Sequence, residues 1–174
     1  MRLDNRCKMW LLCVCSCVSI TGCTQATPDA QQISSDQDRW AQLTSAAQQA
    51  SRRGDQALSE DLYKQAMSAA QSLGPDNDKM AKSFSNLADF YYAQGDGDKA
   101  DQLYSKALKL KEQTLGTQHA DLVADLLGLA RLKFKQGNNS ESLALYKRAI
   151  SILKKSDPKL AQDIMLEYRN AGGH

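Results

Sequence analysis

The chain has 174 residues, 24% of them charged and 42% hydrophobic, and its formal net charge is +2. This length accommodates one ordinary domain with its own core. Arg2, Arg6, Lys8 and Asp4 lie near the N-terminus, and the rest of the chain holds 19 basic residues (22 less three) and 19 acidic ones (20 less one). An electrically neutral domain gives no reason to expect binding to nucleic acid.

The N-terminal segment has the pattern of a secretion signal. The basic residues precede an uncharged run from Met9 to Ile20, which is shorter than the roughly 20 residues that a transmembrane helix needs. All five cysteines lie within the first 23 residues, so the rest of the chain can form neither a disulfide framework nor a cysteine metal site. We expect residues 1–22 to be a signal peptide.

The uncharged run ends in Ile20-Thr21-Gly22-Cys23, which resembles the lipobox of bacterial lipoproteins. The resemblance implies cleavage before Cys23, a diacylglycerol on its thiol and an acyl chain such as palmitate on its amino group. Two or three acyl chains hold a protein durably at a membrane. Thr24 stands where an aspartate would resemble an inner-membrane retention signal, which favours the outer membrane, facing the periplasm, in a host that has one. An ordinary secretory signal is the alternative.

Residues 23–38 are rich in Gln, Ala, Thr, Pro, Asp and Ser, with Ile33 as the one large apolar residue. Such a composition buries little surface. We expect a flexible tether between the lipid anchor and the folded domain.

A pattern of small and aromatic residues then recurs three times. Gly54-Asp55, Gly95-Asp96 and Gly137-Asn138 are each followed, at matching spacing, by a small residue, Leu-Tyr and Ala. The small residues and the alanines upstream of each glycine are Ser59, Ala100 and Ser142, with Ala47, Ala88 and Ala130. Apolar residues on both sides of each glycine follow helical spacing, so each unit is predicted to be a helical hairpin. The glycine suits a left-handed turn, and Asp55, Asp96 or Asn138 suits the cap of the next helix.

These positions resemble the tetratricopeptide repeat pattern, and the 42-residue period with Leu115-Gly116 before a helix resembles kinesin light chains. The resemblance implies an all-α, right-handed superhelix of three hairpins, at about 39–74, 75–116 and 117–156. After the three repeats in 39–155, residues 157–171 are predicted to form a capping helix, because Asp157-Pro158 suits a helix start and Gly172-Gly173 a stop.

The resemblance also implies a groove lined by the first helix of each hairpin, which in the family takes a peptide or a partner helix. Asn86 stands where related proteins hydrogen-bond the backbone of a bound peptide. The predicted groove residues are Arg52, Lys82, Asn86, Asp89, Tyr92, Arg131, Phe134 and Lys135, together with Thr44, Ser45, Gln48, Ser85, Leu127 and Gly128. The alternative for each polar residue is that it lies on a solvent-exposed helix face and binds no partner. Ser45 and Gly128 replace the equivalents of Asn86, so a repeated asparagine ladder is not expected.

The sequence has no arrangement of residues typical of an enzyme active site. His119 precedes a predicted helix and His174 ends the chain, and the pairs Asp76 with Asp78 and Asp96 with Asp98 resemble turn and capping residues. We expect neither an enzyme nor a bound metal or cofactor apart from the lipid. Two functions stay open: an envelope scaffold that binds a protein or peptide partner, and a structural lipoprotein that fills its groove with another copy as a homo-oligomer.

Overall fold

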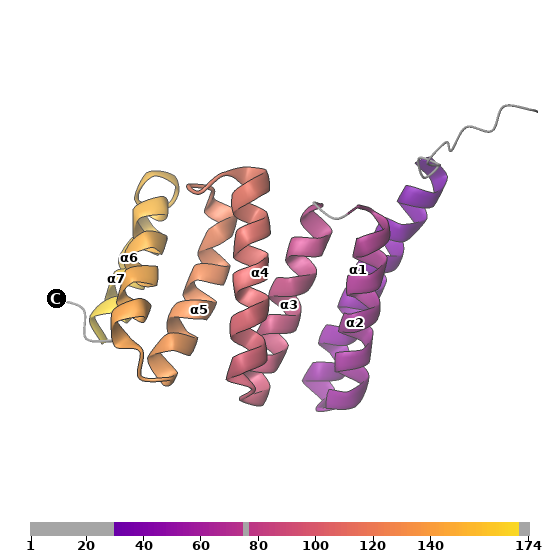
Figure 1. Ribbon diagram of the computed structural model, residues 1–174, viewed down its shortest axis with the longest axis horizontal. Helices are drawn as coiled ribbons and strands as arrows, with labels where there is room; N and C mark the ends of the chain where they lie inside the picture. The colour runs from indigo at the N-terminus through magenta and orange to yellow at the C-terminus, as the bar shows by residue number, and fades with distance from the viewer. Residues whose placement is uncertain (1–29, 75–76, 171–174) are drawn as a thin grey trace, which may run out of the picture.

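The computed structural model describes residues 30–74 and 77–170, which are helical apart from short connections (Figure 1). The helices, in chain order, are α1 (Ala30–Arg53), α2 (Gln56–Ser72), α3 (Asp78–Gln94), α4 (Gly97–Leu115), the short 3-10 helix η1 (Ala120–Leu122), α5 (Val123–Lys135), α6 (Asn139–Ser156) and α7 (Pro158–Asn170). The predicted signal peptide, Cys23, Gly172-Gly173 and His174 lie outside the described residues.

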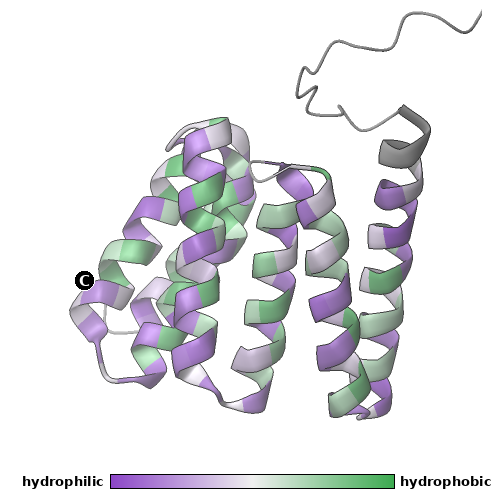
Figure 2. Ribbon diagram, turned by 45° about the vertical axis from the view of Figure 1, so that its right-hand side comes forward, coloured by the Kyte–Doolittle hydropathy of each residue, from purple (hydrophilic) through white to green (hydrophobic). Residues whose placement is uncertain are grey.

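Three antiparallel hairpins, α1–α2, α3–α4 and α5–α6, stand side by side in chain order, and α7 packs on α6 at the end of the row (Figure 1). The first helices also meet, because α1 contacts α3 and α3 contacts α5. We call the surface that α1, α3 and α5 share the first-helix face. Hydrophobic and hydrophilic residues alternate along the helices, as expected where each helix buries one stripe (Figure 2).

The turns inside the hairpins follow the repeated glycines. Gly54, Gly95 and Gly137 have φ of 82°, 83° and 80°, a left-handed conformation that glycine adopts without steric cost. Asp55 and Asp96 then accept hydrogen bonds from the backbone amides of Leu58 and Lys99, as predicted. Asn138 occupies the N-cap position of α6 as predicted, but its side chain makes no capping hydrogen bond, and its backbone carbonyl accepts the Ser142 amide.

The repeated small residues bring the two helices of each hairpin close together. Ser59 and Ser142 are fully buried, and their hydroxyls donate to the carbonyls of Ala47 and Ala130 at 2.9 and 2.7 Å. Ala100, fully buried, occupies the same place in the middle hairpin. A small residue therefore gives close approach, and a serine adds a hydrogen bond across the hairpin without adding volume.

The structure differs from the predicted tether at its C-terminal end, because α1 already begins at Ala30. Extending an existing helix is far easier than starting one, so a polar segment can continue the helix that follows it. Two side chains hold this part of α1 in place: the Trp40 indole donates to Ser83 of α3 at 2.8 Å, and Asp36 accepts from Ser72 of α2 at 3.0 Å.

Asp157 begins α7 as predicted, with its carboxylate accepting the Leu160 amide at 3.0 Å. Ala161, Ile164 and Tyr168 of α7 are buried against α6 and join the core cluster of the last hairpin. This helix covers one side of α6 and is the last helix of the described chain.

Candidate binding face

The first-helix face carries the eight residues predicted to line the groove. Arg52 lies on α1; Lys82, Asn86, Asp89 and Tyr92 lie on α3; Arg131, Phe134 and Lys135 lie on α5. Asn86 and Tyr92 are half-buried and the other six are exposed. The three helices thus place all eight side chains within reach of solvent.

Four of the eight line one pocket of about 210 Å³, and three residues from other helices complete it. The lining consists of Tyr92, Arg131, Phe134, Lys135, Tyr146, Glu167 and Asn170. We call it the α5–α7 pocket. It is amphipathic, because aromatic rings and the stems of long side chains lie beside charged and amide groups.

Arg131 connects the pocket to the last helix. Its Nε and Nη2 donate to Oε1 and Oε2 of Glu167 at 2.6 and 2.9 Å, and the Tyr146 hydroxyl donates to the same carboxylate at 2.9 Å. The Arg131 guanidinium lowers the pKa of Glu167, while burial, and then the Glu167 carboxylate, raise the pKa of Tyr146 to about 12. The carboxylate is therefore ionised at neutral pH and holds Arg131 in a fixed orientation.

An aromatic and a cation form the other side of the pocket. The Lys135 ammonium lies 4.0 Å from the centroid of the Tyr92 ring, a cation–π contact that fixes both side chains. Phe134 is 44% exposed and lines the pocket. The side chain offers apolar contact area that no described residue covers.

The middle of the first-helix face is polar. Asp89 accepts a hydrogen bond from the hydroxyl of Tyr104, and the side chain of Asn86 makes no hydrogen bond to the described residues. Burial, and then the Asp89 carboxylate, raise the pKa of Tyr104. Asn86 thus keeps its amide donor and acceptor available on a half-buried surface.

Gly128 and Thr44 are buried, so the prediction that they line the groove is wrong. A Cβ at Gly128 would lie 2.5 Å from Cζ of Tyr104, which shows that this glycine makes room for the tyrosine ring. Helical register predicts which face of a helix a residue occupies. It does not predict that the Tyr104 ring reaches over Gly128. Leu127 is partly buried and packs against the core.

Arg52 and Lys82 lie outside the pocket, as do Asn86 and Asp89 in the middle of the face. Lys82 pairs with Asp78 at 3.1 Å, and Arg52 belongs to α1 at the far end of the face. Conversely, the sequence analysis missed Glu167, Asn170 and Tyr146 as neighbours of Arg131, because nothing in the repeat pattern shows how α7 packs.

Beneath the face lies an ion pair that the sequence did not predict. The Lys111 ammonium of α4 is 2.6 Å from the Asp125 carboxylate of α5, and it also donates to the Ser85 hydroxyl at 3.2 Å and to the Asp121 carbonyl at 3.3 Å. Asp125 is only 1% exposed, and this burial raises the pKa of its carboxyl although Lys111 opposes the shift. The pair joins the second and third hairpins.

His119 accepts a hydrogen bond from the backbone amide of Asp121 through Nδ1 at 3.2 Å, where the chain enters η1. This is the structural position expected for it. Among the residues that the structure describes, no group of three or more His, Cys, Asp or Glu side chains could hold a metal ion. None of the described helices combines the length and apolar character required to cross a membrane.

A sequence model of the tetratricopeptide repeat family matches residues 79–155, the segment from α3 to α6. Residues 79–155 are tetratricopeptide repeats. No curated protein matches the chain.

Solved tetratricopeptide repeat (TPR) structures have the same fold. BtubC (BKLC) from P. vanneervenii is 21% identical, with a TM-score of 0.62 over 73% of this chain and 57% of that one. A putative kinesin light chain with nearly identical TPR-like repeats from Podosopora anserina, and a form of it with one glutamine replaced by methionine, are 22% identical, with TM-scores of 0.67 over 76% of this chain and 65% of those. The chain thus spans about 57 to 65% of the length of these proteins. The predicted all-α TPR superhelix and the likeness to kinesin light chains are confirmed.

The TPR register also explains the contacts between successive hairpins. Glu60 of α2 accepts from the Tyr91 hydroxyl of α3, and Lys99 of α4 lies 4.7 Å over the Tyr91 ring. The equivalent positions one repeat later hold Asp101, Lys133 and Glu141, which form ion pairs of 3.0 and 3.5 Å. The same three repeat positions therefore link neighbouring hairpins, by a hydrogen bond and a cation–π contact in one case and by two ion pairs in the next.

Proposed function

We propose that the first-helix face binds a protein or peptide partner and that the chain acts as a scaffold rather than as an enzyme. TPR repeats are protein–protein interaction modules, which supports this proposal. The observation that carries it is the α5–α7 pocket, where exposed Phe134 lies beside Lys135 and Arg131, with the free amide of Asn86 on the neighbouring helix. Aromatic and arginine side chains at a concave site are typical of residues that dominate binding energy.

We propose further that the scaffold is anchored in the cell envelope by lipid on Cys23, with the outer membrane, on its periplasmic side, as the favoured location. The lipobox-like Ile20-Thr21-Gly22-Cys23 supports this proposal. Growth with labelled palmitate tests it: the full chain incorporates the label and Cys23→Ala does not. Equal labelling of both proteins would contradict a lipid on Cys23.

Photo-crosslinking in the native host tests the binding face. A benzophenone side chain at Phe134 samples the pocket, and the same group at Lys106, an exposed residue of α4 without a described partner, is the control. We expect capture of one envelope protein from position 134 alone. Equal capture from both positions would contradict the proposal, and self-crosslinks alone would favour the alternative of a self-associating lipoprotein.

A further inference from the structure

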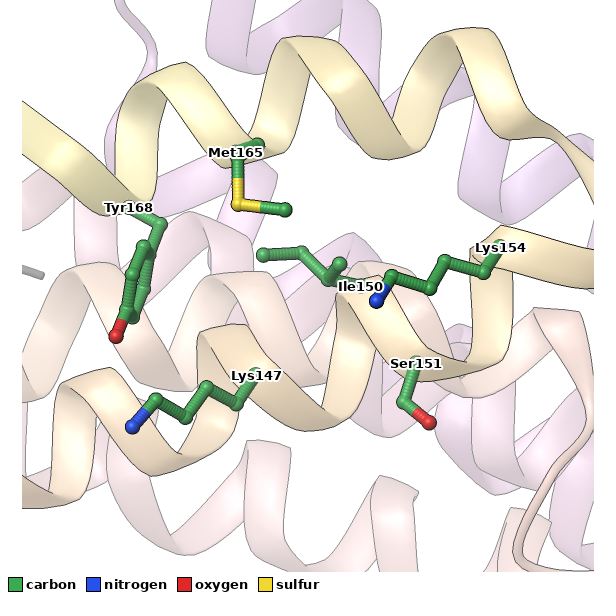
Figure 3. Close-up of a pocket in the computed structure, with 6 residues that line it drawn as sticks. All are labelled: Lys147, Ile150, Ser151, Lys154, Met165 and Tyr168. Carbon is green, nitrogen blue, oxygen red and sulfur yellow. The ribbon is translucent and has the colours of Figure 1, made fainter. Parts of the chain in front are cut away.

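A second groove lies between α6 and α7, at the C-terminal end of the described repeats, and has a volume of about 350 Å³. Its lining consists of Lys147, Ile150, Ser151, Lys154, Met165 and Tyr168, and we call it the open-end groove. Met165 and Tyr168 point from α7 toward Ile150 of α6, and the two lysines stand on α6 on either side of Ile150 (Figure 3). The groove thus has an apolar floor between two cations.

The cations of the open-end groove are not neutralised within the described chain. Lys147 and Lys154 are exposed, and neither forms an ion pair with a described residue. Lys147 lies 5.9 Å from the Tyr168 ring centroid, and no carboxylate lines the groove. A ligand that fits here combines apolar surface with negative charge.

The repeat register identifies the residues of α4 that are equivalent to those lining the open-end groove on α6. Glu112 of α4 is equivalent to Lys154 of α6, and Leu108 is equivalent to Ile150, both one 42-residue repeat earlier. Glu112 binds Arg148 of α6 at 2.5 Å, and Leu108 packs against both core clusters. On α4, therefore, the position of Glu112 contacts the second helix of the next hairpin. On α6 the equivalent positions, Lys154 and Ile150, line the open-end groove.

The charge at this position is reversed between the two repeats. Where α4 presents a glutamate to Arg148, α6 presents Lys154. A helix with the sequence of α6, which would bring an arginine to this point, would be repelled. The complementary helix carries an acidic residue there instead.

We propose that the open-end groove binds an amphipathic helix of another protein, with an acidic side chain on Lys154 and apolar side chains on Ile150 and Met165. The bound helix takes the place that the second helix of a further hairpin would occupy. This surface is separate from the first-helix face, and the inference does not rest on the function proposed for that face.

The test uses the full chain and a labelled peptide with the sequence of α6, residues 139–156, in which Arg148 is replaced by glutamate. The native α6 peptide is the matched control. Fluorescence anisotropy should show that the R148E peptide binds about fivefold more tightly than the native peptide, the size expected when an exposed attractive charge pair replaces a repulsive one. In the Lys154→Glu protein this preference should reverse.

Two further variants separate the groove from general charge effects. Met165→Glu, at a half-buried position, should abolish binding of the R148E peptide, and Lys106→Glu, which makes the same charge change as Lys154→Glu on α4, should leave it unchanged. Circular dichroism checks that each variant remains helical. Absence of binding by either peptide, or a preference that Lys154→Glu does not alter, would overturn the proposal.

Discussion

The Arg131 guanidinium of α5 donates two hydrogen bonds of 2.6 and 2.9 Å to the Glu167 carboxylate of α7. Arg131 lies in the third repeat and Glu167 in the helix that follows the repeats. This pair, with Tyr146 bound to the same carboxylate, closes the C-terminal side of the α5–α7 pocket. The last helix therefore contributes a wall of the proposed binding face as well as covering α6.

Glu167→Gln should lower the free energy of unfolding at pH 7 by about 0.5–1 kcal/mol, because the pair is bidentate but partly exposed to solvent. The pKa of Glu167 is lowered in the folded state, so its stabilising contribution is present above the unfolded pKa and is lost as the pH falls through the folded pKa. Urea unfolding should therefore show the difference from wild type at pH 7 and a smaller one at pH 3. Asp163→Asn, an exposed change on the same helix, serves as control, and a difference independent of pH would contradict the assignment.

Gly128→Ala should destabilise the protein by about 1–3 kcal/mol through overpacking against the Tyr104 ring. Gly97→Ala is the comparison, since its Cβ would meet Leu132 and Gln136 side-chain atoms at 3.2 and 3.4 Å, a milder contact than the one at Gly128. Thermal unfolding of both variants checks the prediction. Equal melting temperatures would mean that Gly128 does not make room for Tyr104.

The buried serines between the two helices of a hairpin should tolerate loss of the hydroxyl but not added volume. Ser142→Ala should lower stability by about 0.5–1.5 kcal/mol, the contribution of one hydrogen bond, because Ala100 fills the equivalent place in the middle hairpin. Ser142→Leu should cost more, since the site is fully buried. Denaturant titrations that gave the opposite order would contradict close helix approach as the role of this residue.

Lys111→Met should destabilise the protein by about 3–5 kcal/mol, because it leaves Asp125 buried without its cation. Burial raises the pKa of Asp125 and Lys111 opposes that shift, so without Lys111 the folded carboxyl holds its proton more tightly and stability falls more steeply as the pH rises. The loss should therefore be greater at pH 8 than at pH 5 in urea titrations. Lys106→Met is the control, and a loss that shrinks toward pH 8 would contradict this account.

The repeated glycines, small residues and tyrosines predicted the hairpins, because close helix approach restricts which residues fit at each place. Tyr104 beneath Gly128 could not be predicted, since register identifies a face of a helix but not how far a neighbouring ring extends. The start of α1 at Ala30 differs from the composition-based prediction because contacts of Asp36 and Trp40 hold a polar segment helical.

The candidate site was accessible from the sequence only in part. Tyr92, Arg131, Phe134 and Lys135 share one pocket because α3 and α5 present the same register. Glu167 and Asn170 come from α7, whose packing angle depends on three-dimensional contacts beyond the repeat pattern. Lys111 and Asp125 likewise meet across two repeats at a distance that no local pattern reveals.

The most direct test of the proposed binding face is the affinity of the purified full chain for the protein captured from position 134, measured for wild type, Phe134→Ala and Lys106→Ala. Phe134 is exposed, so its removal leaves the core intact. If the first-helix face holds the partner, Phe134→Ala weakens binding by about tenfold while Lys106→Ala has no effect. Equal affinity of all three proteins would contradict the account.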